Sequence, residues 1–239
     1  MEKIQTAIIT GGSRGIGKEI AIALARKKVN VVICSRTQEH LDVTVAELRK
    51  IHSQVLGIKC DVSAKKQVDS LVNETLNKFK DIDILVNNAG IALVKKLVDT
   101  TDEEWNSLID INLTGAFNCT KAVLPHMISR NSGTIINMAS GAGKVGFENL
   151  SAYCASKFGM MGMAQSLAWE VANTNIRVMS ICPGEVDTDM QRDADPEYYK
   201  QNHESMICPS YVAERVIHLV YDDIACTNGH VEDIYNRPP

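Results

Sequence analysis

Short apolar stretches alternate with amphipathic stretches along almost the whole chain. The apolar stretches are rich in Val and Ile, which favour strands, and each is bounded by polar residues or glycine. The predicted strands are Lys3–Thr10, Asn30–Ser35, Val55–Cys60, Ile82–Val86, Gly133–Met138, Ile176–Cys182 and a short last one near His230–Ile234. The predicted helices are Gly15–Lys27, Glu39–His52, Ala64–Lys80, Glu103–Arg130, Ala152–Asn173 and Ser210–Asp222.

The alternation of buried strands with amphipathic helices is typical of a parallel sheet that is covered on both faces. The second predicted helix illustrates the pattern, because Leu41, Val45 and Leu48 fall on one face of it. No linker, repeat or low-complexity stretch interrupts the sequence. We therefore expect one α/β domain over residues 1–239, a Rossmann-like doubly wound parallel sheet.

Composition and charge narrow the class of protein further. The chain has 239 residues, of which 45% are hydrophobic and 23% charged, with a formal charge of -4. This balance disfavours disorder, and the lack of a basic block disfavours nucleic acid or a membrane surface as a partner. No apolar run approaches the ~20 residues of a membrane span. The first residues lack the features of a signal peptide, so we expect a cytoplasmic protein.

The seven cysteines are widely spaced and form no CxxC pair or Cys/His cluster. A metal site is therefore not predicted, and most of these thiols are expected to be buried and reduced.

A glycine-rich turn, Thr10–Gly17, joins the first strand to the first helix. Gly11, Gly15 and Gly17 would let the backbone approach a phosphate group, and the helix N-terminus offers free N–H groups to it. The spacing differs from the general G-x-G-x-x-G fingerprint, so a tight turn without a ligand is the alternative.

The end of the second strand bears on which dinucleotide would bind. An acidic residue there is typical of NAD binding, because it holds the ribose hydroxyls. This strand instead ends in Ser35-Arg36, and Arg14 lies in the glycine turn. Two arginines suit a 2′-phosphate, so NADP(H) is predicted in preference to NAD(H). The alternative is that both are solvated surface residues.

Tyr153 and Lys157 are one helical turn apart at the start of a predicted helix, so they share a face. A nearby cation would lower the tyrosine pKa from ~10 toward neutrality and make Tyr153 a proton donor or acceptor. Ser140 follows the fifth strand, at the sheet edge where such folds bind ligands. Asn112 lies inside a long helix, where Asn is a poor helix former.

With these residues together, the chain resembles a classical short-chain dehydrogenase/reductase over nearly its whole length. Among members of that family it is most similar to those of the 3-oxoacyl reductase and carbonyl reductase type. The residues that carry the resemblance are Thr10-Gly11, Gly15, Gly17, Asp61-Val62, Asn87-Asn88-Ala89-Gly90, Asn112, Ser140, Tyr153, Lys157, Pro183-Gly184 and Thr188.

The resemblance implies a role for each residue in this set. The catalytic residues would be Asn112, holding a water in a proton relay, Ser140, bonding the carbonyl oxygen, Tyr153, the proton donor, and Lys157. The implied cofactor contacts are Gly11, Ser13, Arg14, Gly15, Ile16, Gly17, Ser35, Arg36, Asp61, Val62, Asn88, Ala89, Gly90, Tyr153, Lys157, Pro183, Gly184 and Thr188. Asp61 has a second interpretation, in which it caps a turn.

The expected function is NADPH-dependent reduction of a ketone or aldehyde, 3-oxoacyl thioesters included, with a small-molecule carbonyl compound as substrate. The alternatives are an alcohol or polyol dehydrogenase working oxidatively, and an NADP(H)-binding regulator with weak chemistry. The polar segment 189–206 corresponds to the family's substrate lid; a solvated surface helix is the other interpretation.

A homodimer or homotetramer is also expected. The helix after Tyr153 carries more apolar residues than one contact with a sheet needs, among them Phe158 and Met163. The C-terminal stretch Asn228–Pro239 departs from the family pattern, so the choice between the two assemblies stays open.

Overall fold

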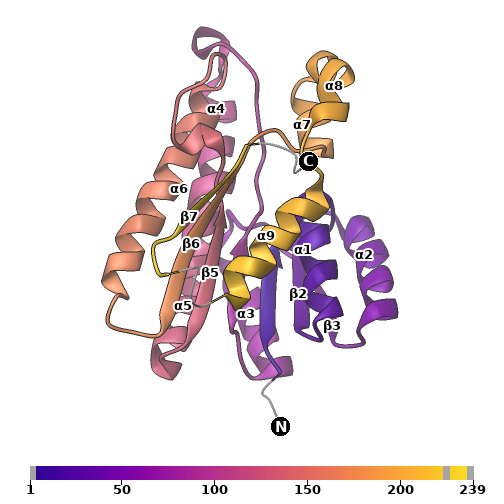
Figure 1. Cartoon of the computed structure of the whole chain (residues 1–239), viewed down its shortest axis with the longest axis vertical. Coiled ribbons are helices and arrows are strands. Elements are labelled where there is room, and N and C mark those ends of the chain that lie inside the picture. The colour runs from indigo at the N-terminus through magenta and orange to yellow at the C-terminus, as the bar shows by residue number, and fades with distance from the viewer. Residues whose placement is uncertain (1–3, 223–226, 236–239) are drawn as a thin grey trace.

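The strands form a single parallel sheet with the first strand near its middle. The structure is a computed structural model that describes residues 4–222 and 227–235 (Figure 1). Within them the sheet has the order β3-β2-β1-β4-β5-β6-β7, and every neighbouring pair is parallel. The strands are β1 (Thr6–Thr10), β2 (Asn30–Ser35), β3 (Val55–Lys59), β4 (Ile84–Asn87), β5 (Gly133–Met138), β6 (Ile176–Pro183) and β7 (Val231–Ile234).

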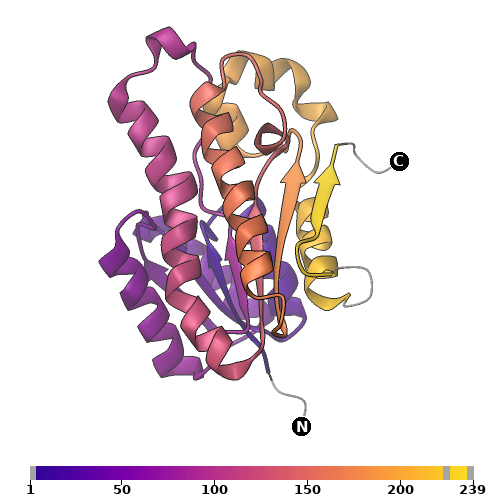
Figure 2. The same cartoon turned by 90° about the vertical axis from the view of Figure 1, so that its left-hand side faces the viewer.

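Helices cover both faces of this sheet (Figures 1 and 2). One face is covered by α1 (Gly15–Arg26), α2 (Gln38–Ile51) and α9 (Pro209–Tyr221). The other is covered by α3 (Lys65–Phe79), α5 (Gly115–Arg130) and α6 (Ser151–Glu170). Successive strand side chains point to opposite faces, so Ile9 joins the first core and Ile8 the second. The predicted doubly wound fold is confirmed.

The long helix predicted at Glu103–Arg130 is divided into three pieces. It consists of α4 (Asp102–Leu108), a π-helical stretch η2 (Ile109–Thr114) and α5. A capping box at Thr101 and Glu104 fixes the start of α4. A π-helical stretch is rare and often marks a functional site. The hydrophobic periodicity gave no sign of it.

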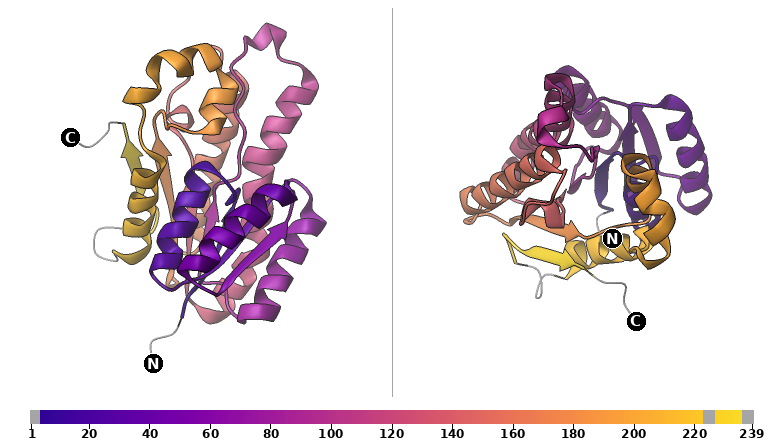
Figure 3. Two further views of the ribbon diagram at one scale, coloured as in Figure 1. Left: turned by 90° about the vertical axis from the view of Figure 1, so that its right-hand side faces the viewer. Right: turned by 90° about the horizontal axis from the view of Figure 1, so that it is seen from above.

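The segment after β6 forms two short helices, α7 (Asp189–Ala194) and α8 (Pro196–Asn202), above the carboxyl ends of the strands (Figures 1 and 3). In the described residues, no helix is long and apolar enough to cross a membrane. The six cysteines among them are free thiols. Cys226 and the final Pro238-Pro239 lie outside the described residues.

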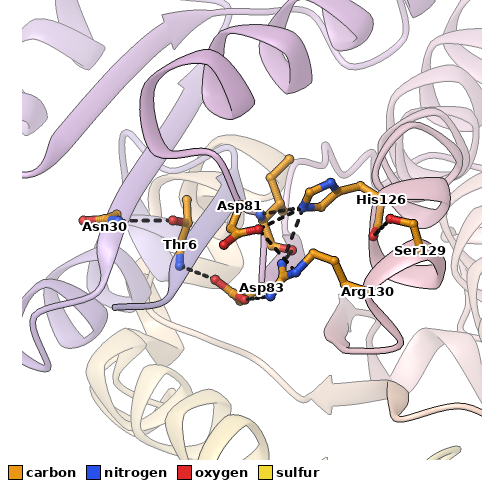
Figure 4. A network of polar contacts seen from close by, with 8 residues as sticks. Thr6, Asn30, Asp81, Asp83, His126, Ser129 and Arg130 are labelled. Atoms are coloured by element: carbon orange, nitrogen blue, oxygen red, sulfur yellow. Dashed lines mark hydrogen bonds and ion pairs between the residues drawn. The ribbon is translucent and has the colours of Figure 1, made fainter. Parts of the chain in front are cut away.

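The amino ends of the central strands are joined by a polar network (Figure 4). The Asp83 carboxylate accepts a hydrogen bond from the Thr6 backbone N–H at 2.8 Å and another from Arg130 at 2.7 Å. Arg130 also lies 3.2 Å from Asp81, which in turn lies 3.5 Å from the imidazole of His126. The network therefore ties β1, β4 and α5 together at the end of the sheet opposite the cavity described below.

Candidate active site

A cavity opens at the carboxyl ends of β1, β2 and β4. Most residues predicted to contact a cofactor lie in its wall: Gly11, Ser13, Arg14, Gly15, Ile16, Ser35, Arg36, Asp61, Val62, Asn88, Ala89, Gly90 and Thr188. Gly17, Tyr153, Lys157, Pro183 and Gly184 lie outside this wall. The wall also contains residues that the sequence did not predict, namely Thr37, His40, Cys60, Ile111, Asp189 and Met190.

The glycine turn shapes one side of the cavity. Gly11 and Gly15 have φ angles of +63° and +53°, which residues with a Cβ rarely adopt. Gly17 lies in the first turn of α1, and a Cβ there would come within 2.4 Å of the Gly11 carbonyl oxygen and the Asn88 amide nitrogen. The glycines thus let the turn fold tightly against the end of β4.

Thr10 and Asn88 lock this turn to the neighbouring strand. The Thr10 hydroxyl oxygen accepts the backbone N–H groups of Asn88 at 2.9 Å and of Ala89 at 3.0 Å. The Asn88 side-chain amide donates to the carbonyl oxygens of Thr10 at 2.9 Å and Gly11 at 3.2 Å. Its amide protons are therefore used to brace the turn, and its contact with the cofactor stays a prediction.

Two arginines are among the lining residues of the cavity. Arg14 is the N-terminal cap residue of α1, and Arg36 follows β2. Both line the same cavity and both are exposed, so their contact with a 2′-phosphate stays a prediction. Asp61 lines it too, and its carboxylate also accepts the Ser63 backbone N–H at 3.0 Å and the Ser63 hydroxyl at 2.7 Å. Both interpretations of Asp61 therefore describe its position.

Lys157 and Tyr153 lie together near the start of α6. The Lys157 ammonium is 5.6 Å from the centroid of the Tyr153 ring and donates a hydrogen bond to the Met138 carbonyl oxygen at 2.8 Å. Burial lowers the pKa of Lys157 from 10.5 to about 8. Burial also raises the pKa of Tyr153 from 10.0 to about 12, against a smaller opposing effect of its hydrogen bond to Ser140.

The expectation that Lys157 lowers the tyrosine pKa toward neutrality is therefore wrong for this structure. Desolvation is the largest cause of the raised tyrosine pKa, and it exceeds the lowering effect of the Ser140 hydrogen bond.

Ser140 caps the short turn η3 (Gly141–Gly143) that follows β5. Its hydroxyl oxygen accepts the Ala142 backbone N–H at 3.1 Å, which leaves its proton free to point elsewhere. The hydroxyl also bonds to Tyr153. The structure thus brings Ser140, Tyr153 and Lys157 into one cluster.

Asn112 occupies the π-helical stretch and is fully buried. Its amide group donates to the Ile91 carbonyl oxygen and to the Ser156 hydroxyl, both at 3.0 Å, and its oxygen accepts the Ile91 N–H at 2.8 Å. Ser156 in turn donates to the Tyr153 carbonyl oxygen at 2.7 Å. Asn112 therefore connects the loop after β4 to α6, and its place in a water relay stays a prediction. Ser156 was missed, since no pattern marks it.

This arrangement fits a dinucleotide with a reactive end near Tyr153. The glycine turn and the first N–H groups of α1 are suited to a pyrophosphate, and the two arginines to a further phosphate. The cluster of two hydroxyl donors and a cation is suited to stabilise a developing oxyanion. Residues 189–206 lie beside the cavity through Asp189 and Met190.

Comparisons with known proteins agree with this geometry. A family model described as short chain dehydrogenase matches residues 5–198. The chain is 40% identical over 194 residues to a 3-oxoacyl-[acyl-carrier-protein] reductase of Synechocystis sp., covering 81% of this chain and 78% of the relative. It is 34% identical over 233 residues to that of Thermotoga maritima, covering 95% and 94%. A crystal structure of an actinorhodin polyketide ketoreductase variant with NADPH superposes with a TM-score of 0.93 at 32% identity, covering 99% and 97%.

Proposed function

Since the chain belongs to the short chain dehydrogenase family, we propose that it uses NADPH to reduce a ketone or aldehyde to the alcohol. The observation that carries the proposal is the cluster of Ser140, Tyr153 and Lys157 at the carboxyl edge of the sheet, next to the glycine-lined cavity. The relatives named as 3-oxoacyl reductases and the ketoreductase support 3-oxoacyl thioesters as the first substrates to test.

NADP(H) is the cofactor that the cavity favours. Arg14 and Arg36 both line it, and Ser35 stands where an NAD-binding fold has a carboxylate. Gly11 and Gly15 line the cavity beside the proposed pyrophosphate position, and Gly17 lets the turn pack tightly behind them. The ketoreductase with the similar fold was crystallised with NADPH.

When bound, NADPH supplies the hydride to the carbonyl carbon of the substrate. Tyr153 holds the proton that the resulting alkoxide takes, since a pKa of about 12 keeps the phenol protonated at neutral pH. Lys157, still largely charged below pH 8, stabilises the phenolate left behind. Ser140 donates to the carbonyl oxygen while its own oxygen is held by Ala142.

We also propose a substrate lid and an oligomeric state. Residues 189–206 would cover the substrate, and we expect the enzyme to be cytoplasmic. Phe117, Phe158 and Trp169 are exposed on the paired helices α5 and α6, which supports a homodimer or homotetramer through this face. Light scattering of the protein in solution measures the oligomeric state. A monomer at micromolar concentration would exclude both the homodimer and the homotetramer.

The test of the activity follows the absorbance of NADPH and NADH in parallel. Acetoacetyl-CoA, a diketone, an aromatic aldehyde and a simple sugar serve as substrates, with Tyr153→Phe as the control. We expect turnover that prefers NADPH and disappears in the variant. NAD⁺-linked oxidation of alcohols alone would favour the oxidative dehydrogenase. Tight NADPH binding with no turnover of any compound would favour a regulator.

A further inference from the structure

Two acidic side chains of the lid contact Arg14, which lines the cofactor cavity. A guanidinium nitrogen of Arg14 lies 3.8 Å from the Asp189 carboxylate and 3.7 Å from the Asp193 carboxylate. Asp189 itself lines the cavity together with Arg14 and Arg36. Two acidic side chains of segment 189–206 therefore lie against a cation of the cofactor site.

The local structure holds these two carboxylates in place. Asp189 and Asp193 are four residues apart in α7, so they lie on one face of it. The Thr188 hydroxyl accepts the Gln191 N–H and caps the helix. Arg192 pairs with Asp189 at 2.7 Å and lies 3.7 Å from Asp193. The carboxylates thus sit between two guanidinium groups, one from the lid and one from the cofactor cavity.

We propose that Asp189 and Asp193 are specificity-determining residues that limit the preference for NADPH over NADH by competing for Arg14. The proposal rests on the proposed function, because it takes Arg14 as a partner of the 2′-phosphate. A phosphate monoester carries close to two negative charges at neutral pH. A phosphate held by Arg14 lies within the Debye length of ~8 Å of any carboxylate that contacts the same guanidinium.

The effect is selective because NADH lacks this phosphate. The two carboxylates repel the negative 2′-phosphate of NADPH near Arg14. The pyrophosphate is common to both cofactors, so its interactions do not change the preference between them. The same competition links the lid to the cofactor, since linkage is reciprocal. A 2′-phosphate on Arg14 weakens the contact between Arg14 and α7, so NADPH loosens the lid at this corner more than NADH does.

The experiment measures the dissociation constants of NADPH and NADH by nicotinamide fluorescence on the full-length protein. The double substitution Asp189→Asn with Asp193→Asn removes both charges and keeps the side-chain size. We expect the ratio of the NADH to the NADPH dissociation constant to rise by roughly two- to tenfold, the scale of two exposed charge contacts. Asp193→Asn alone, outside the first turn of α7, gives part of the rise and guards against misfolding of the double variant.

Two further variants test the route through Arg14. Glu197→Gln removes the same charge from α8, where the described residues show no ion pair with Arg14, and should leave the ratio unchanged. In an Arg14→Ala background the double substitution should lose at least half of its effect on the ratio, because the shared guanidinium is gone.

The outcomes separate this proposal from the proposed function. An unchanged ratio, or a ratio that falls because the carboxylates orient Arg14 for the phosphate, overturns it while leaving the enzyme NADPH-dependent. An equal rise in the Arg14→Ala background overturns the route through Arg14. If the unmodified protein binds neither dinucleotide, the proposed function fails and this proposal fails with it.

Discussion

The Lys157 ammonium lies 5.6 Å from the centre of the Tyr153 ring and donates a hydrogen bond to the Met138 carbonyl oxygen. This hydrogen bond holds the ammonium at the end of β5, next to the protonated phenol of Tyr153. Desolvation is the largest cause both of the lowered pKa of about 8 for Lys157 and of the raised pKa of about 12 for Tyr153. A proton donor that stays protonated beside a cation suits the reductive direction.

Replacement of Tyr153 by Phe removes the proposed proton donor and keeps the ring. We expect turnover of the best carbonyl substrate to fall at least ~100-fold, the lower range for general acid catalysis. The dissociation constant of NADPH should change little. Tyr221→Phe, at the end of α9, is the matched control and should retain activity. Full activity of the Tyr153 variant would refute the proton-donor role.

The pH dependence of the reaction should report Lys157. The pKa of about 8 means that its positive charge is lost as the pH rises through 8, and the phenolate then lacks its partner. We expect kcat/KM for NADPH, which reports groups of the free enzyme, to fall above about pH 8.

The same shift bears on stability with a defined sign. Between about pH 8 and 10.5 the unfolded chain binds a proton at Lys157 that the folded chain has lost. The free energy of unfolding therefore rises with pH in this range.

A Lys157→Arg variant keeps its charge and should move the alkaline limb of the kcat/KM profile to higher pH. A limb that stays in place would assign it to another group.

Arg36→Ala should weaken NADPH far more than NADH, because a charge-assisted bond to the 2′-phosphate is lost. The expected loss for NADPH is about tenfold or more. Arg26→Ala, at the far end of α1, is the control and should leave both constants unchanged. Equal losses for the two cofactors would show that Arg36 does not hold the 2′-phosphate.

Two glycines in helices provide a contrast between a required and a replaceable position. A Cβ on Gly17 would come within 2.4 Å of the Gly11 carbonyl oxygen, whereas a Cβ on Gly162 in α6 would meet nothing within 4 Å. Gly17→Ala should cost about 1–3 kcal/mol of stability and weaken NADPH binding. Gly162→Ala should be neutral or stabilise by up to ~1 kcal/mol. Thermal unfolding and cofactor titration measure both, and similar behaviour of the two variants would contradict the steric explanation.

The fold and much of the site followed from local sequence patterns. The helical spacing of Tyr153 and Lys157 is a local feature that depends on nearby residues in the sequence. The same holds for the glycine turn between a strand and a helix. The burial of Lys157 is different, because it depends on Met138 and on packing between elements that are distant in the sequence. The desolvation that raises the pKa of Tyr153 also comes from packing between distant elements, so the direction of that shift could not be predicted from the local spacing.

Features that join distant segments could not be predicted at all. The π-helical stretch around Asn112 is selected by its contacts with Ile91 and Ser156, and hydrophobic periodicity carries no record of them. The ion pairs of Arg14 with α7 likewise require α7 to lie next to the start of α1, at the wall of the cavity.

The network at the opposite end of the sheet should affect stability and leave cofactor binding alone. Asp83 has only 7% of its surface exposed and accepts bonds from both Thr6 and Arg130. Asp83→Ala would leave the Thr6 N–H without this partner and Arg130 with only its contact to Asp81, so we expect a loss of about 2 kcal/mol in the free energy of unfolding. Chemical denaturation measures the loss, and Asp69→Asn, in an exposed pair with Lys65, should change it by less than ~0.5 kcal/mol. The dissociation constant of NADPH should stay the same, because the cavity lies at the carboxyl ends of the strands. A large change in that constant with no change in stability would mean that the network acts on the site instead.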